Sequence, residues 1–312
     1  MKNTAWIDKP YYSLNAYLHH QFHEKVYKVS LDGGMTCPNR DGTLGTKGCI
    51  FCSAGGSGEF AGDRRLSITK QIDREIALVR TKRHVNHFIA YFQAYTNTYA
   101  PVEYLRKIFT EAIMHPDVVA LSIGTRPDCL PPDVLKLLSE LQQEKPIWVE
   151  LGLQTIHDNT ALYIRRGYKL PCFVHAVREL SSRDIPVIVH LILGLPGETK
   201  EDVLASIDYL NTLPISGIKL QLLHVLKGTD LAQEYAAGKF QLLSESAYED
   251  LLIACVSRLR PDIVIHRLTG DGPKDLLIAP LWSSAKRRVL NHLHHRMALE
   301  NITQGMDYQE KE

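Results

Sequence analysis

The chain has 312 residues, of which 45% are apolar and 23% are charged, and its formal net charge is +1. This composition is typical of a folded protein and excludes a disordered chain or a disulfide scaffold. The small net charge also disfavours a protein that coats nucleic acid without specificity. The length suits one large domain such as an α/β barrel.

The N-terminal sequence MKNTAWIDKPYYSLNAYLHHQF lacks the apolar run of a signal peptide. The most apolar stretch, residues 186–195, is too short to cross a bilayer. We therefore expect a cytoplasmic protein without membrane attachment. Thiols stay reduced in that compartment, so clustered cysteines there indicate metal binding or catalysis.

Residues 1–24 show little periodicity, and we expect them to form an N-terminal leader packed across one end of the main domain. Six short apolar strands follow, each before a helical pattern. The strands are expected at 25–31, 87–93, 118–124, 147–154, 186–194 and 217–225. The helices are expected at 68–83, near 102–114, from Pro131 and Pro132, as two short segments across 157–183, after a capping box at Thr199 and Asp202, and near 244–259.

Strands that alternate with helices pair in parallel, because each parallel pair needs a crossover connection. The predicted fold class is therefore α/β, with residues 25–260 forming a partial (β/α)6 TIM-type barrel. Residues 261–312 form a C-terminal helical extension that begins with one more strand. Ligands of such folds collect at the carboxyl ends of the strands, so functional residues are expected in the loops that follow them.

The extension is basic: residues 266–300 contain six Lys or Arg, three acids and four His. This segment is the best candidate surface for an anionic substrate. A solvated helix face explains the same pattern. His224 and Lys227, at the end of the sixth strand, are further candidates to face a substrate.

The loop after the first strand, residues 32–62, contains Cys37, Cys49 and Cys52, the last two as a C-x-x-C pair. Structural zinc prefers four ligands, whereas an iron-sulfur cluster used for chemistry can leave one iron open. Three thiols on one loop therefore favour an open cluster. A zinc site completed by a distant His or Cys, or three unligated thiols, are the alternatives. We expect the remaining cysteines to be structural; they are Cys129, Cys172 and Cys255.

This loop, with Phe51 before its last cysteine, resembles the cluster loop of the radical SAM superfamily. Its eleven residues between the first two cysteines resemble the Elongator catalytic subunit and its short bacterial relatives without the acetyltransferase domain. Further segments agree in order over roughly residues 25–230. They are FQAYTNT (92–98), GTRPD (124–128), VELGLQTIHD (149–158), RRGY (165–168) and HLILGLPGET (190–199).

The resemblance implies that Cys37, Cys49 and Cys52 hold a 4Fe-4S cluster whose open iron binds S-adenosylmethionine (SAM). It further implies reductive cleavage of SAM to a 5′-deoxyadenosyl radical, with electrons from a donor such as flavodoxin or ferredoxin. The positions that match SAM-contacting residues of the family are Thr96 near the methionyl amino group, Gln154 at the ribose, Arg166 near the methionyl carboxylate and His190 near the ribose.

Other positions of the matching segments have structural interpretations. Gly124 departs from the pattern, because Elongator-like sequences usually carry Glu there, and Glu150 is a candidate to supply that polar contact. Arg126 and Asp128 are expected to form a structural ion pair. The glycines of GLPGET are expected to make a tight turn into a helix.

Relatives of this type act on the wobble uridine of tRNA, so the resemblance implies modification of its 5-substituent. The basic C-terminal segment would then contact phosphates while the flipped base enters the barrel. One alternative is a radical SAM oxidoreductase that acts on a small metabolite or a tetrapyrrole. The other is a non-catalytic metal-binding or RNA-binding protein.

Overall fold

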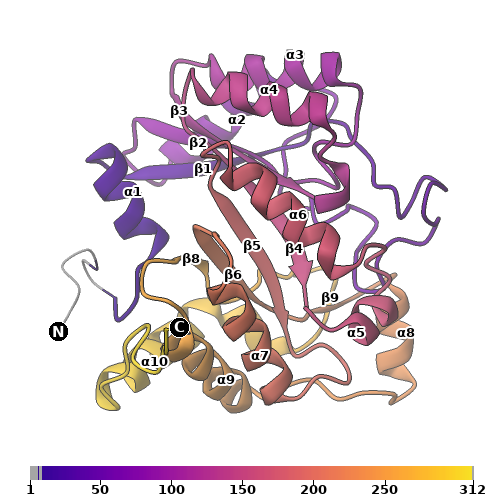
Figure 1. Ribbon diagram of the computed structural model, residues 1–312, viewed down its shortest axis with the longest axis vertical. Helices are drawn as coiled ribbons and strands as arrows, with labels where there is room; N and C mark the ends of the chain where they lie inside the picture. The colour runs from indigo at the N-terminus through magenta and orange to yellow at the C-terminus, as the bar shows by residue number, and fades with distance from the viewer. Residues whose placement is uncertain (1–5, 7–8, 311–312) are drawn as a thin grey trace.

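The computed structural model describes Trp6 and residues 9–310. A sheet of seven parallel strands curls into a partial barrel with helices on its outer side (Figure 1). The predicted α/β half-barrel is therefore confirmed. Residues 1–5 and 7–8 of the predicted leader, and 311–312 of the predicted extension, lie outside the described residues.

The seven strands follow chain order across the sheet, β1-β2-β3-β4-β5-β6-β8. All six predicted strands are present, and β8, from the predicted extension, pairs with β6 as a seventh. A separate antiparallel pair joins β7 to β9. The strands are β1 (Val26–Leu31), β2 (His87–Phe92), β3 (Val118–Thr125), β4 (Ile147–Gln154), β5 (Val187–Leu193), β6 (Gly217–Leu222), β7 (Val225–Leu226), β8 (Val264–Arg267) and β9 (Leu277–Ala279).

The helices predicted between the strands are present. The helices Leu14–Phe22, before β1, and Asp230–Ala236, after β7, were not predicted. Of the helices in the described part of the chain, none is long and apolar enough to cross a membrane. The α-helices are α1 (Leu14–Phe22), α2 (Ile68–Arg80), α3 (Val102–Ile113), α4 (Pro132–Gln142), α5 (Asp158–Tyr163), α6 (Leu170–Ser181), α7 (Lys200–Asn211), α8 (Asp230–Ala236), α9 (Glu245–Arg258) and α10 (Lys286–Leu299). Two short 3-10 helices span Pro127–Cys129 and Leu281–Ala285.

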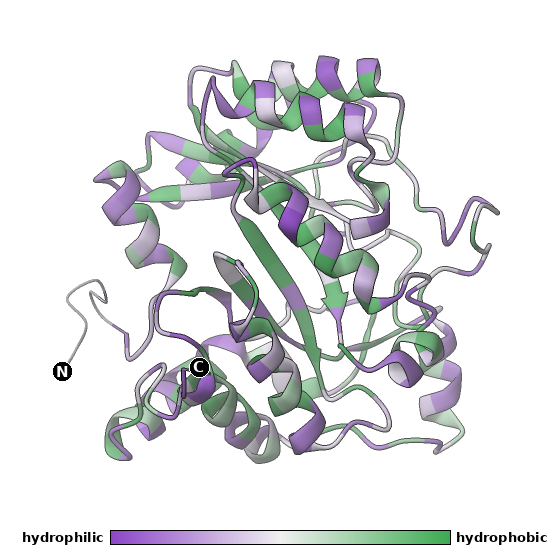
Figure 2. Ribbon diagram, in the orientation of Figure 1, coloured by the Kyte–Doolittle hydropathy of each residue, from purple (hydrophilic) through white to green (hydrophobic). Residues whose placement is uncertain are grey.

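The sheet has two faces because successive side chains of a strand point to opposite sides. The outer face and the inner sides of the helices form the main apolar core, and Figure 2 shows apolar strands beside helices striped with polar residues. The base of the inner face forms a second apolar cluster, which includes Val26, Ile89, Trp148 and Ile188 and is covered by Leu18 of α1. Toward the carboxyl ends of the strands, the inner face carries mainly polar residues, together with the apolar Ile192.

The free edge of β8 is covered by the N-terminal segment. Ile265 N donates to Tyr12 O at 2.8 Å, and Ser13 forms an isolated parallel bridge with Ile265. Gln304 ties this segment to the C-terminal end of the chain: its backbone N donates to Pro10 O, and its side-chain oxygen accepts from Tyr12 N. Both ends of the described chain therefore meet at the same edge of the sheet.

Candidate active site at the carboxyl ends of the strands

The three cysteines of the loop between β1 and α2 lie close enough to influence one another. Burial raises the pKa of Cys49 to about 11, and the neighbouring Cys52 and Cys37 add to the shift. Asn39 Nδ2 donates to Cys49 Sγ at 3.5 Å. Burial also raises the pKa of Cys52, against the positive charge of Arg40. The loop thus places an N–H donor and a guanidinium beside the thiols, which stabilises metal-bound thiolates.

All three thiols are free and partly exposed. No three His, Cys, Asp or Glu side chains within the described ranges meet closely enough to hold a single metal ion. The thiolates that bind an iron-sulfur cluster each hold a different iron, so they stand apart rather than converging on one point. A set of three thiols on one loop fits such a cluster.

The loops after β2 and β3 pack against the cysteine loop. Thr96, which is buried, donates its backbone N–H to Thr36 O at 3.2 Å, directly before Cys37. Arg126 forms the predicted ion pair with Asp128 through two hydrogen bonds of 2.9 and 2.7 Å, so that interpretation is confirmed. The bond from Thr96 to Thr36 holds the segment before the first cysteine against the carboxyl end of β2.

Arg166 lies inside the protein beside the cysteine loop, with only 1% of its surface exposed. Its guanidinium donates to the backbone oxygens of Leu153, Thr155 and Tyr168 at 2.5–3.0 Å. Its Nη2 is buried and has no partner among the described residues. A rigid guanidinium with one unused donor group fits an anionic group of a bound cofactor, such as a carboxylate.

Gln154 ends β4 in the left-handed region, with φ +68°, next to a register shift between β4 and β5. Its carboxamide folds back toward Gly152, where an added Cβ would lie 2.8 Å from Nε2. The turn after β5 contains Gly194 and Gly197, both with positive φ, and leads into the capping box of α7. The tight turn expected from GLPGET is therefore present.

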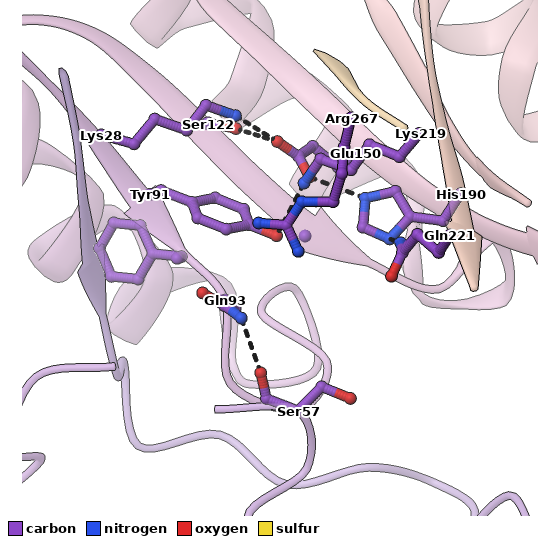
Figure 3. Close-up of polar contacts among 12 residues, drawn as sticks. Lys28, Ser57, Tyr91, Gln93, Ser122, Glu150, His190, Lys219, Gln221 and Arg267 are labelled. Carbon is purple, nitrogen blue, oxygen red and sulfur yellow. Dashed lines mark hydrogen bonds and ion pairs between the residues drawn. The ribbon is translucent and has the colours of Figure 1, made fainter. Parts of the chain in front are cut away.

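His190 lies within a buried polar layer inside the barrel, centred on Glu150 (Figure 3). One oxygen of this carboxylate accepts from Lys28 Nζ at 2.7 Å and from Ser122 Oγ at 2.8 Å. The other oxygen accepts from His190 Nε2 at 2.7 Å and from Lys219 Nζ. Although burial disfavours ionisation, these partners hold the pKa of Glu150 well below its ordinary value. The carboxylate therefore stays charged at the centre of the barrel.

Tyr91 lies between the two lysines of this layer. The Nζ atoms of Lys28 and Lys219 are 4.8 and 4.7 Å from the centre of its ring, a cation–π arrangement. Burial lowers the pKa of Lys219 to about 7, against the attraction of Glu150. Glu150 also stands opposite Gly124 in the β3–β4 ladder, at the position where the Elongator-like pattern departs.

Most residues of this layer were not predicted from the sequence. The sequence does contain a pattern that indicates the layer. Polar residues recur at every second position of apolar strands, as in Lys28 and Ser30 or Lys219 and Gln221. Such alternation places these side chains on one face, here the inner one.

The position of His190 in the buried layer leads to a testable prediction about how stability depends on pH. Burial, reinforced by Lys219, lowers the pKa of His190 from 6.5 to about 4, despite its bond to Glu150. The unfolded chain then binds more protons between pH 4 and 6.5, so stability rises with pH across that window. His190→Gln should flatten the rise by up to ~1.4 kcal/mol per pH unit in urea unfolding. The same change at exposed His84 should not, and an unchanged slope in the His190 variant would contradict the assignment.

A cavity of about 890 Å³ opens above this layer. Three parts of the chain line it, each with a different chemistry. The cysteine loop contributes the aromatic rings of Phe51 and Phe60, and strand ends contribute the carboxamides of Gln93 and Gln221. The C-terminal segment contributes cations that include Lys286. The predicted extension is therefore a wall of the cavity.

Most basic side chains of the C-terminal segment are neutralised. Within the described ranges, ion pairs engage four of the six. Arg267 and Lys286 pair with Asp271, Arg288 with Glu245, and Arg296 with Glu249, Asp250 and Glu300. Lys274 lines the cavity without an ion pair in the described structure. The broad anionic-substrate surface expected from sequence is therefore reduced to a few cations at the cavity mouth.

His224 and Lys227, the two residues after β6 that are candidates to face a substrate, have different positions. His224 lines the cavity, and its Nε2 lies 3.1 Å from Ser283 Oγ. Lys227 instead donates to the backbone oxygen of Asp275 at 2.8 Å from an exposed position. Of the two, His224 is the one placed to meet a substrate.

Comparison with known proteins gives two family matches. A model of the radical SAM superfamily matches residues 41–210, and a model of the radical SAM C-terminal domain matches residues 215–298. The first match includes Cys49 and Cys52 and begins after Cys37. The second includes β6, β8 and α10, so it spans the boundary predicted at residue 260.

Three relatives place the chain more closely. Protein YtqA of Bacillus subtilis is 44% identical over 305 residues, which cover 98% of this chain and 95% of that protein. A tRNA uridine(34) acetyltransferase of Dehalococcoides mccartyi is 26% identical over 196 residues, 61% of this chain and 42% of the relative. The solved structure of Elp3 from Methanocaldococcus infernus has a TM-score of 0.68 at 17% identity, over 89% of this chain and 64% of that one. This structural likeness shows the half-barrel fold.

Proposed function

Because the chain belongs to the radical SAM superfamily, whose enzymes use a 4Fe-4S cluster and SAM, we propose that it modifies the 5-substituent of the wobble uridine of tRNA. When bound, these cofactors supply a 5′-deoxyadenosyl radical that removes a hydrogen atom from the substrate. The electron would come from a separate carrier such as flavodoxin or ferredoxin. The protein's own residues hold the cofactors, place the substrate and exclude water.

Cys37, Cys49 and Cys52 are the proposed cluster ligands, and the free Nη2 of Arg166 supports its proposed contact with the SAM carboxylate. Thr96 lies beside the cysteine loop through its bond to Thr36, which supports a contact with the methionyl amino group. Gln154, at the end of β4, remains the proposed ribose contact. His190 is hydrogen-bonded to Glu150 and Gln221, which favours a role in positioning the residues below the cavity over direct contact with SAM.

The composition of the cavity is the observation that carries the proposed substrate. Aromatic rings stack on a flipped base, carboxamides hydrogen-bond its edge, and cations contact the adjacent phosphates. All three kinds of group line this one cavity, and its aromatic residues belong to the loop with the three cysteines. A base bound there would lie next to the proposed radical source. The similarity to a tRNA uridine(34) acetyltransferase supports the same substrate class.

The test compares modified nucleosides of total tRNA by mass spectrometry in strains with and without the gene. Deletion should remove one wobble-uridine nucleoside and accumulate the precursor with the unprocessed 5-substituent. The wild-type gene should restore the product, whereas a Cys49→Ala copy should not. An unchanged set of wobble nucleosides would reject the tRNA substrate and favour a small metabolite.

A further inference from the structure

Gln221 joins the buried layer to the cavity. Its side chain lines the cavity at the end of β6, and its Nε2 lies 3.1 Å from His190 Nδ1. His190 in turn contacts Glu150 through its other nitrogen, Nε2, at 2.7 Å. A continuous chain of hydrogen bonds therefore runs from the buried carboxylate to the substrate space (Figure 3).

The direction of every hydrogen bond in this chain is determined by the carboxylate. Glu150 is flanked by Lys28 and Lys219 and stays ionised, so it only accepts. His190 must then carry its proton on Nε2. The ring is neutral near neutral pH because burial lowers its pKa to about 4, which leaves Nδ1 as an acceptor.

Gln221 must therefore turn its NH2 group toward His190, because the opposite orientation would place two acceptors face to face. Its carboxamide oxygen is then held on the side away from His190, as Figure 3 shows. Among the described residues, no group donates to this oxygen. The cavity wall thus presents an acceptor with a fixed orientation. Gln93, the other carboxamide, is instead anchored by its own NH2 group to Ser57 O at 2.8 Å.

We propose that Gln221 is a specificity-determining residue that recognises a neutral pyrimidine base with a hydrogen atom on N3. Its carboxamide oxygen would accept the hydrogen bond from the N3–H group of the base. This inference rests on the proposed function and adds to it the base edge that is read. His190 and Glu150 act as positioning residues, since they reach the substrate only through Gln221. A uracil base has this N3–H donor, whereas cytosine has an acceptor at N3.

The test measures binding by cofactor-loaded protein, under anaerobic conditions, of two anticodon stem-loop RNAs. They carry uridine or N3-methyluridine at the wobble position and are otherwise identical. Wild-type protein should bind the unmethylated RNA about 2- to 13-fold more tightly, the discrimination expected for one hydrogen bond. Gln221→Ala and Gln221→Met should bind both RNAs alike, with the affinity of wild-type protein for the methylated RNA. Gln233→Ala, which changes an exposed carboxamide of α8 outside the cavity lining, should keep the preference.

The outcomes separate this inference from the proposed function. Equal binding of the two RNAs by wild-type protein, or an undiminished preference in both Gln221 variants, would overturn the role of Gln221 and leave the tRNA substrate standing. If wild-type protein binds neither RNA, the tRNA substrate and the role of Gln221 both fall. Retained binding of the methylated RNA by the variants shows that they are folded and that only the recognition of N3–H has been lost.

Discussion

Replacing Cys49 with alanine is expected to abolish both iron-sulfur loading and SAM cleavage. Cys49 is one of three free thiols on the loop after β1, and the proposed cluster would take a thiolate from each. Iron and sulfide content after anaerobic reconstitution, together with 5′-deoxyadenosine formed in the presence of a reductant, measures the loss. Cys37→Ala and Cys52→Ala should have the same effect, because no fourth cysteine lies on this loop.

Cys172→Ala is the matched control. Cys172 is also free and partly exposed, but it lies in α6 on the outside of the sheet. Its variant should retain the iron content and the SAM cleavage of the wild-type protein, and so should Cys129→Ala and Cys255→Ala. Loss of the cluster in the Cys129 variant would show that the loop thiols are not the complete set of ligands. A colourless wild-type protein that binds one zinc ion would reject the cluster altogether.

Replacing Glu150 with glutamine is expected to destabilise the protein by about 3–5 kcal/mol, the range for breaking a buried ion pair from one side. Glu150 is 1% exposed and neutralises two lysines, Lys28 and Lys219. Glutamine preserves the volume but removes the charge, so both lysines lose their counter-charge. The pKa of Lys219, about 7 beside Glu150, then falls further, and Lys28 keeps an unpaired ammonium group. Urea unfolding at neutral pH measures the change in the free energy of unfolding.

Two further variants make the Glu150 prediction specific. Glu140→Gln breaks the exposed ion pair with Arg106 and should cost less than ~1 kcal/mol. The double variant Glu150→Gln with Lys219→Met should recover part of the lost stability, because it removes one of the two buried amines left without the carboxylate. A Glu150 variant no less stable than the Glu140 variant would show that the interior lysines do not need the carboxylate.

The architecture was predictable because it depends on local patterns. Apolar strands and amphipathic helices alternate along the chain, and parallel pairing follows from that alternation. The cysteine spacing likewise lies within one loop. The short antiparallel pair β7–β9 was missed, since strands of two and three residues leave too little periodicity to detect.

The polar interior and the charge of the cavity mouth were not predictable from sequence. Glu150 meets Lys28 and Lys219 only because β4, β1 and β6 face one another across the barrel, at separations of 122 and 69 residues. The basic C-terminal segment was overestimated for a similar reason. Several of its acidic partners, such as Glu245 and Glu249, come from α9 and lie outside the segment in which charges were counted.

The covered edge of β8 has a consequence for folding during synthesis. Tyr12 contacts Ile265 and Gln304, the latter across 292 residues, so these contacts carry one of the largest loop-closure costs in the chain. Until Gln304 has left the ribosome, the last strand of the sheet has an incomplete cover. An exposed strand edge is a template for pairing with other chains. The residues around Gln304 therefore help to end the period in which the nascent sheet is open to aggregation.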